Sequence, residues 1–460
     1  MKALFALWVL LLVLGVNEAS ADEVTQQEYE ERLERYDLEA KPESHKNLAS
    51  WCKRNYPAKY NYHLRAYNEL QFSRYEADLP AEPGPNDLKD ARDKAGKLGL
   101  EDKAAEYHAR WGKLQYEIHA KRLKPGDVTM MKQLLIWADK EELNDLQEVR
   151  ELAEGVIEKE PDTELARGVL GHLKVEGEWK SRMELLEGMD ASSVEERIKM
   201  HKLLASARNE QEVKYPINPF SGMSQETKGY SFHPKKSPGA KMWIHEKGYS
   251  RSKPCRLVIA LHGGGSGGTE KSYSHAQTTV SAWASANTRE PFVVLCPAAT
   301  EHVTNSWGTL SNVLEILDAA EEVCGLFNID RKRIYVTGQS MGGGGTTLWY
   351  MCFPEFTAAS VGRAGWFHHE ARYQMDCMQK PIMIIQGEKD EAFRVESKVK
   401  FLETAEKINA DLTNISHPDL DHSLFFHLIE DDMFGFFEKH TNDIEPDWDV
   451  IRAAARKWMK

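Results

Sequence analysis

The feature that most constrains the fold is a serine held between two glycines where a strand is expected to turn into a helix. The segment Gly338-Gln-Ser340-Met-Gly342 directly follows the apolar run 334–337 and precedes the helical stretch 346–352. A chain that turns this sharply brings its flanking residues so close together that side chains would clash beside the serine. The serine hydroxyl is therefore expected to stand exposed above the end of the strand.

A second glycine cluster is expected to lie beside the first. His262-Gly-Gly-Gly265 directly follows the apolar run 257–261, a pattern that matches the oxyanion loop of esterases and lipases. Glycines let backbone N–H groups approach a substrate oxygen, so the N–H groups of Gly264 and Met341 are the expected donors. No Gly-Lys-Ser or Gly-Lys-Thr follows, which argues against a phosphate-binding loop. The side chain of His262 is interpreted as structural.

Residues 213–460 show the alternation of an α/β domain. Continuous apolar runs, typical of strands buried on both faces, alternate with helical stretches such as 310–324 and 398–408. Two short runs, 230–232 and 241–245, are expected to be antiparallel lead-in strands. This alternation predicts a mostly parallel sheet flanked by helices. Buried strands are expected at 256–261, 292–296, 334–337, 358–361 and 382–386.

Residues 22–212 are predicted to form an all-α N-terminal region. They are rich in Glu, Lys, Leu and Ala, and apolar residues recur at helical spacing. The region has no Ser/His/Asp set and no metal-binding pattern of its own. We interpret it as a helical scaffold or a platform for a protein partner. Helices are expected at 25–36, 90–98, 101–123, 130–138 and 143–158.

The first 21 residues are predicted to be a secretory signal peptide. A basic start at Lys2 is followed by the apolar run 3–16 and by the small residues Ala19-Ser-Ala21. Cleavage is expected after Ala21, which predicts a secreted or periplasmic protein. The run is shorter than the roughly 20 residues that span a bilayer. No other stretch is long and apolar enough, so no membrane span is expected in the mature chain.

Charge and cysteine content exclude several classes of protein. The formal net charge of −13 argues against a nucleic-acid binder, which usually carries a basic surface. The spacing of Cys and His does not suit zinc, and no other metal site or cofactor is expected. The six cysteines either remain buried thiols or form one or two disulfides, which an exported protein can oxidise.

The two glycine clusters resemble those of the α/β-hydrolase superfamily. Within it, the chain looks most like the poly(3-hydroxybutyrate)-depolymerase, feruloyl-esterase and prolyl-oligopeptidase-like group. The resemblance rests on segments 257–265 and 330–343 and on two later segments, and it covers roughly residues 230–440. It implies an α/β-hydrolase fold after the helical region, with Ser340 as the nucleophile. It also implies that the acid and the base follow the serine, in the order Ser, Asp or Glu, His.

The expected acid and base lie on two loops near the C-terminus. Gly387-Glu-Lys-Asp390 follows the strand expected at 382–386, where similar hydrolases carry the acid, so Asp390 is the expected acid and Glu388 its competitor. His422 lies 32 residues beyond Asp390 and just before a helical run, where such enzymes often carry the base. His417 and His427 are its rivals. Asp390 would orient the imidazole of His422 and stabilise its charged form.

Three residues are candidate substrate contacts. Gln339 precedes the serine, Trp307 lies in a loop before the helix that leads to the serine strand, and Trp366 follows the strand expected at 358–361. Ligand sites in parallel α/β sheets lie at the carboxyl ends of the strands, where these residues are expected. Each of the three could also belong to the core.

Three functions remain open from the sequence. The leading interpretation is an exported serine hydrolase that cleaves a small-molecule or polymer-linked carboxylic ester through an acyl-enzyme. A serine peptidase of the prolyl-oligopeptidase-like type is the second, although no repeats of a β-propeller are visible. A non-catalytic binding protein on a hydrolase scaffold is the third, and the complete Ser/Asp/His set argues against it.

Overall fold

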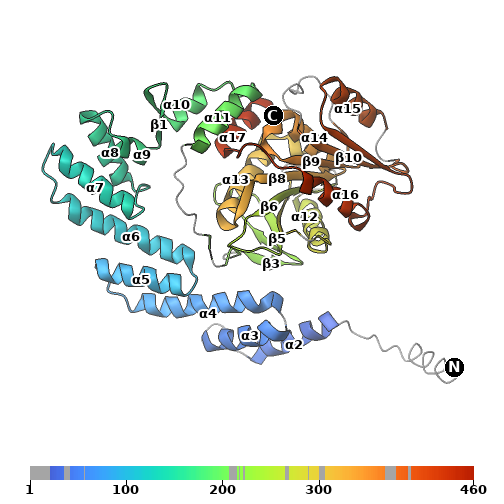
Figure 1. The fold of residues 1–460 in the computed structure, drawn as a ribbon. Coiled ribbons are helices and arrows are strands. Elements are labelled where there is room, and N and C mark those ends of the chain that lie inside the picture. Colours follow the sequence, from blue (N-terminus) through green and yellow to red (C-terminus); the bar gives the residue numbers. More distant parts are fainter. Residues whose placement is uncertain are drawn as a thin grey trace. The chain divides into compact units, whose positions relative to one another are not determined.

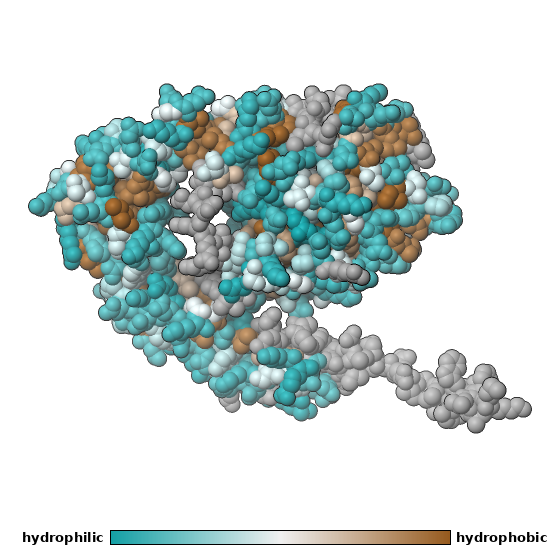
Figure 2. Space-filling view, in the orientation of Figure 1, coloured by the Kyte–Doolittle hydropathy of each residue, from teal (hydrophilic) through white to brown (hydrophobic). Residues whose placement is uncertain are grey.

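The computed structural model describes residues 21–35, 42–55, 57–206, 215–216, 218–220, 223–264, 269–288, 290–299, 306–367, 380–391 and 395–459. The expected signal peptide, except for Ala21, lies outside these ranges. The chain divides into two compact units, Met1–Met130 with Trp137–Leu146 and Met131–Ile136 with Gln147–Lys460. The boundary expected at 212/213 therefore falls inside the second unit. The face visible in Figure 2 is mainly hydrophilic, as a chain with 28% charged residues should be.

The first unit consists of helices in the part that the structure describes (Figure 1). Three of its helices share a small apolar core that includes Phe72, Leu88 and Tyr107. Proline begins several helices, because its fixed φ suits the first turn and its missing N–H has no intrahelical acceptor there. The helices are α2 (Ala21–Arg35), α3 (Pro42–Asn55), α4 (Pro57–Ala77), α5 (Pro85–Lys97) and α6 (Glu101–Ala120), and α7 (Val128–Lys140) is divided between the units.

A β-hairpin interrupts the region expected to be all-α. Strands β1 (His172–Val175) and β2 (Glu178–Ser181) pair antiparallel. The two residues that join them, Glu176 and Gly177, have φ of 54° and 89°, the left-handed pair that closes a tight hairpin. The prediction of an all-α region is therefore wrong at this point. The surrounding helices are α8 (Gln147–Lys159), α9 (Glu164–Val169), α10 (Arg182–Glu187) and α11 (Val194–Ser206).

A nine-stranded sheet forms the centre of the second unit (Figure 1). Its spatial order is β11-β10-β9-β8-β6-β7-β5-β4-β3, with β3, β4 and β5 antiparallel and the remaining six strands parallel. The strands are β3 (Ser224–Glu226), β4 (Gly229–Phe232), β5 (Met242–Lys247), β6 (Cys255–Leu261), β7 (Phe292–Pro297), β8 (Ile329–Gln339), β9 (Ala359–Arg363), β10 (Ile382–Gly387) and β11 (Leu412–His417).

Helices cover both faces of this sheet and bury an apolar core on each. One core includes residues of α13 (Leu310–Leu326), α14 (Met341–Cys352), α15 (Val395–Lys407) and α17 (Trp448–Trp458). The other includes residues of α12 (Thr269–Ala284) and α16 (Phe426–Lys439). Strands buried on both faces are mostly apolar, and every residue of β6, β7 and β10 is buried, with Arg256 and Gln386 as polar exceptions. The expected mostly parallel α/β fold after a helical region is confirmed.

Residues 182–206 are attached to the sheet domain by ion pairs. Arg197 of α11 and Glu355 of the short 3₁₀ turn Pro354–Phe356 have no exposed surface, and Arg197 Nη2 donates to Glu355 Oε2 at 3.0 Å. Arg182 at the start of α10 pairs with Asp447 and, at 2.8 Å, with Asp449 of α17. Because a buried charge is stable only when it is paired, the contact between Arg197 and Glu355 holds residues 182–206 against the sheet domain.

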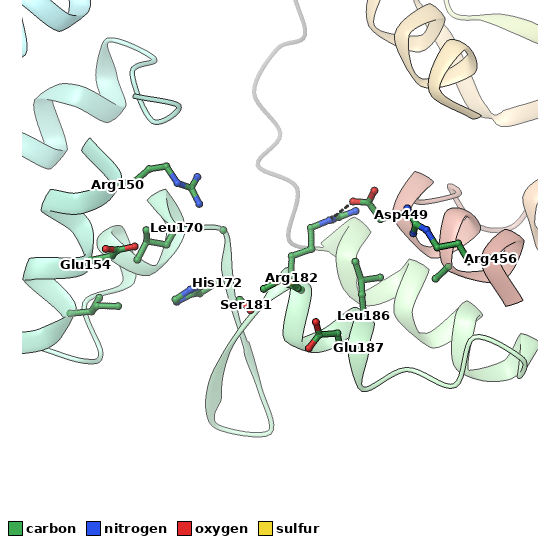
Figure 3. A pocket seen from close by; sticks show the side chains of 14 residues that line it. Arg150, Glu154, Leu170, His172, Ser181, Arg182, Leu186, Glu187, Asp449 and Arg456 are labelled. Atoms are coloured by element: carbon green, nitrogen blue, oxygen red, sulfur yellow. Dashed lines mark hydrogen bonds and ion pairs between the residues drawn. The ribbon is translucent and has the colours of Figure 1, made fainter. Parts of the chain in front are cut away.

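A cavity of about 1060 Å³ lies within the second unit, and none of its lining residues belongs to the nine-stranded sheet (Figure 3). Its walls come from α8, the β1 hairpin, α10 and α17. They carry Arg150, Arg182 and Arg456 against Glu154, Glu187 and Asp449, which leaves no net charge when His172 is neutral.

Five of the six cysteines lie in the described residues, where all are buried thiols: Cys52, Cys255, Cys296, Cys324 and Cys352. Burial and the charge of Glu246 raise the pKa of Cys255 to about 12, and burial raises that of Cys296 well above its usual value. Both groups are therefore protonated and unreactive at neutral pH. Cys377 lies outside the described residues.

Candidate active site

Ser340 lies in a strained turn at the end of the central strand. It caps α14 with φ 57° and ψ −118°, a region that residues with a side chain rarely adopt. A Cβ on Gly338 would lie 2.4 Å from the carbonyl carbon of Gly342, and one on Gly342 would lie 2.2 Å from the carbonyl oxygen of Leu261. Both glycines are therefore required by close backbone contacts, as the sequence pattern predicts.

Three side chains from separate loops form a hydrogen-bonded chain. His422 Nε2 lies 3.0 Å from Ser340 Oγ, and His422 Nδ1 lies 3.0 Å from Asp390 Oδ2. Ser340 follows β8, Asp390 follows β10, and His422 follows β11. Because parallel strands end at the same edge of a sheet, loops far apart in sequence meet there. Asp390 is 8% exposed, and its carboxylate can accept a hydrogen bond from the Nδ1–H of His422, which leaves Nε2 to accept from the serine hydroxyl.

The rival residues do not join this chain. Glu388 is exposed on the same loop as Asp390. His417 Nε2 lies 3.4 Å from Asp432 on α16, and His427 is exposed with its ring beside Phe425. The structure therefore brings together the three residues that were the preferred candidates.

The glycine loop after β6 lies directly beside the serine. A Cβ on Gly263 would lie 3.2 Å from the Cβ of Ser340. Gly264 has φ 98°, and the ring of His275 occupies the space that a side chain on Gly264 would need. Strands β6 and β8 pair with Leu261 opposite Gly338, which sets the loop beside the turn. The N–H of Met341 belongs to the first turn of α14, where helical N–H groups have no acceptor within the helix.

His262 supports this loop from within. It is 2% exposed, its Nδ1 donates to the carbonyl of Gly263 at 2.7 Å, and its Nε2 accepts from the N–H of Ala299 at 3.3 Å. These partners fix the ring beneath the loop, and neither is a catalytic group.

Two of the expected substrate contacts have other partners. Trp307 has no exposed surface, and its indole N–H donates to the carbonyl of His262 at 3.1 Å, so the ring packs beneath the loop and does not face a ligand. The side-chain amide of Gln339 donates to the carbonyls of His422 and Ser423. Trp366, in contrast, is 47% exposed after β9 and remains a candidate contact.

Two polar residues at the strand ends were not singled out from the sequence. Gln386 is 9% exposed and donates from Nε2 to Asp390 Oδ2 at 3.0 Å. Arg363 is 4% exposed, its carbonyl accepts from the N–H of Ser340 at 2.9 Å, and its guanidinium lies 5.8 Å from the ring of Phe426. Burial lowers the pKa of Arg363 to about 10, which leaves it charged at neutral pH. Both residues close apolar runs, and a polar residue at the end of a buried strand is the signal that could have revealed them.

Among the described residues, no group of three or more His, Cys, Asp or Glu side chains is arranged to hold a metal ion. In the same part of the chain, every helix is too short or too polar to cross a bilayer.

Residues 297–448 match the model of the dienelactone hydrolase family. No curated protein matches the chain. Among solved structures, a thermostable esterase is 21% identical over 48% of this chain and 64% of its own, with a TM-score of 0.37. S-formylglutathione hydrolase from Staphylococcus aureus is 18% identical over 45% and 95%, with a TM-score of 0.35. Thermogutta terrifontis esterase 2 is 13% identical over 47% and 93%, with a TM-score of 0.37.

The chain thus spans less than two thirds of the length of that thermostable esterase. The segment that matches the family model contains Ser340, Asp390 and His422, and it extends from the end of β7 to the start of α17. That segment is therefore similar to the dienelactone hydrolase family, and it belongs to the mostly parallel α/β sheet described above.

Proposed function

We propose that this protein is an exported serine hydrolase that cleaves carboxylic esters through an acyl-enzyme. The observation that carries the proposal is the hydrogen-bonded chain from Ser340 through His422 to Asp390, with 3.0 Å at each step. Such a chain pairs a nucleophile with a general base and orients the base by a third group. Kinship to the poly(3-hydroxybutyrate)-depolymerase and feruloyl-esterase group stays part of this proposal.

Ser340, His422 and Asp390 have distinct roles in the proposed reaction. His422 Nε2 accepts the proton of Ser340 as Oγ attacks the ester carbonyl, and the same nitrogen then donates that proton to the departing alcohol. Asp390 accepts from Nδ1, holds the imidazole in the required tautomer and stabilises its cationic form. Water, activated in turn by His422, attacks the acyl-enzyme and releases the acid. Proton transfer of this kind contributes about 10²–10⁴ in rate.

The N–H groups of Met341 and Gly264 would hold the oxyanion. Charge develops on the carbonyl oxygen as the tetrahedral intermediate forms, and fixed backbone donors stabilise it without reorganisation. The N–H of Met341 also lies at the positive end of the α14 dipole. Loss of one such donor costs about 3–4 kcal/mol of barrier. Trp366 is the proposed substrate contact, because its ring is the one expected contact that is exposed.

The proposal also covers the location of the protein and the role of its N-terminal region. The leader ending at Ala21 would direct the chain to a secreted or periplasmic location, where a small-molecule or polymer-linked ester is the substrate. The helical N-terminal region would serve as a scaffold or bind a protein partner. Mass spectrometry of the mature N-terminus tests the first point, because a chain that keeps Met1 after expression in a secreting host contradicts export.

Hydrolysis of a p-nitrophenyl ester by the full chain tests the catalytic proposal. Ser340→Ala should lower kcat at least about 10³-fold, and His422→Ala by a similar factor, because residues that act as a unit are not additive. Ser274→Ala, an exposed serine on α12, is the matched control and should keep full activity. Full turnover in Asp390→Ala and His422→Ala alongside an inactive Ser340→Ala would contradict the assigned partners. Cleavage of a peptidyl amide but of no ester would favour a peptidase.

A further inference from the structure

Two glutamine side chains donate hydrogen bonds into the group formed by Ser340, His422 and Asp390. Gln339 is the last residue of β8 and immediately precedes the serine. Gln386 is the residue before the last in β10, on the strand that leads to the acid. Neither side chain is needed for proton transfer, and each uses its amide on a residue of the site.

Gln339 ties the base to the nucleophile. Its Nε2 donates to the carbonyl oxygen of His422 at 2.9 Å and to that of Ser423 at 2.6 Å. Both hydrogens of one amide are thereby used on two consecutive peptide carbonyls. The side chain of His422 returns to Ser340 Oγ at 3.0 Å. The contacts close a ring: Ser340 is bonded covalently to Gln339, the Gln339 amide donates to His422, and the His422 ring contacts the Ser340 hydroxyl.

Gln386 fixes the acid in the same way. Its Nε2 donates to Asp390 Oδ2 at 3.0 Å, and that oxygen also faces His422 Nδ1 at 3.0 Å. Gln386 is 9% exposed and the Asp390 side chain is fully buried, so water has little access to compete for this bond. A second donor on the carboxylate limits its rotation.

We propose that Gln339 and Gln386 are positioning residues that hold the His422 loop and the Asp390 carboxylate in register with Ser340. The inference rests on the proposed function, because positioning matters only if these three residues carry out the reaction. It replaces the expectation that Gln339 contacts substrate. A displacement of about 1 Å in a reacting group can cost about 10²-fold in rate, so the effect should appear in kcat.

Kinetics of the full chain on p-nitrophenyl acetate test this role. Gln339→Leu and Gln386→Leu should each lower kcat about 10- to 100-fold and leave KM within about twofold. Gln147→Leu is the matched control, because that glutamine lies on α8 and bonds only to the exposed Glu151 at 2.8 Å. Its kcat should be unchanged. A raised KM with an unchanged kcat in Gln339→Leu would instead assign that side chain to substrate binding and overturn the proposal.

A variant of equal length separates positioning of the acid from simple loss of structure. Gln386→Met keeps the length of the side chain but loses the donor to Asp390 Oδ2. A lowered kcat with an unchanged KM and an unchanged unfolding midpoint supports the positioning role. A normal kcat counts against Gln386.

Two further variants keep the outcome decisive. Gln339→Met keeps the length of the side chain without its donors, so a normal unfolding midpoint with normal kcat overturns the role of Gln339 even if Gln339→Leu misfolds. Ser340→Ala distinguishes a failure of the proposed function from a failure of the positioning role alone. If it retains turnover, the proposed function itself fails. If it is inactive while both glutamine variants keep wild-type kcat, only the positioning role fails.

Discussion

Replacing Arg197 by methionine should strongly destabilise the second unit, because Glu355 would stay buried after losing its counter-ion. Arg197 donates to both oxygens of Glu355, one of them at 3.0 Å, and to the carbonyls of Ala191 at 2.7 Å and Cys352 at 3.2 Å. Neither side chain of the pair has exposed surface. Water therefore cannot replace the lost bonds.

The expected loss in the free energy of unfolding is about 3–5 kcal/mol, the usual cost of removing one partner from a buried pair. With a urea m value of about 3 kcal/mol/M, the midpoint should fall by roughly 1–1.7 M. The double variant Arg197→Met/Glu355→Met should lose less than Arg197→Met alone, because no unpaired charge is left in the interior. Lys199→Met is the control on the same helix, and losing its exposed pairs with Glu195 and Glu196 should leave the urea midpoint nearly unchanged.

Acid pH supplies an independent check on the same pair. Burial alone raises the pKa of Glu355, but the proximity of His201 and the bonds from Arg197 outweigh it and lower the pKa below the usual 4.5. A lowered pKa means that the pair's contribution is complete above pH 4.5 and is lost as the pH falls through the folded-state value. The difference in stability between wild type and Arg197→Met should therefore narrow as the pH falls below 4.5. Urea titrations followed by near-ultraviolet circular dichroism measure both effects. Equal midpoints for Arg197→Met and Lys199→Met would refute the reasoning.

Two further predictions concern the glycine turn and the thiols. Gly342→Ala should abolish ester hydrolysis or lower the unfolding midpoint, because its Cβ would lie 2.2 Å from the carbonyl oxygen of Leu261. Gly435→Ala, in α16 with no atom within 4 Å, should instead gain about 0.5–1 kcal/mol, and comparable unfolding midpoints would contradict this. Cys255 and Cys296 should resist iodoacetamide at pH 8 in the native protein and react after unfolding in urea, since raised pKa values keep both thiols protonated. Peptide mass spectrometry after labelling reads this directly, and rapid labelling of either thiol in the folded protein would be the contrary result.

Patterns with one dominant physical cause could be predicted from the sequence. The doubly buried strands β6, β7 and β10 are mostly apolar, with Arg256 and Gln386 as polar exceptions, and the expected ranges lie within a residue or two of the observed ones. The glycines around Ser340 reflect a steric requirement that only backbone crowding explains. The position of Asp390 and His422 follows from the parallel sheet, since loops at its carboxyl edge meet.

The missed features depend on neighbours that a sequence pattern does not reveal. Strand β11 (Leu412–His417) lies at the sheet edge and is only half-buried, so Thr413, Asn414 and Ser416 hid it among loop residues. The loop that carries Trp307 was expected to line the substrate pocket, but the indole N–H of Trp307 donates to the buried carbonyl of His262. Gln339 lies next to the nucleophile, but the direction of its amide depends on a loop 83 residues away.

The attachment of residues 182–206 to the sheet domain sets an order of events during protein synthesis. Glu355 follows Arg197 by 158 residues, and Asp447 follows Arg182 by 265. At about 5–20 residues per second, the ribosome needs roughly 8–32 s after Arg197 to supply Glu355 and roughly 13–53 s after Arg182 to supply Asp447. Until then α10 and α11 have emerged without their counter-ions, and their arginines stay in water. Docking of α11 must therefore wait until Glu355 has left the ribosome, and docking of α10 must wait longer, until Asp447 at the start of α17 has left it.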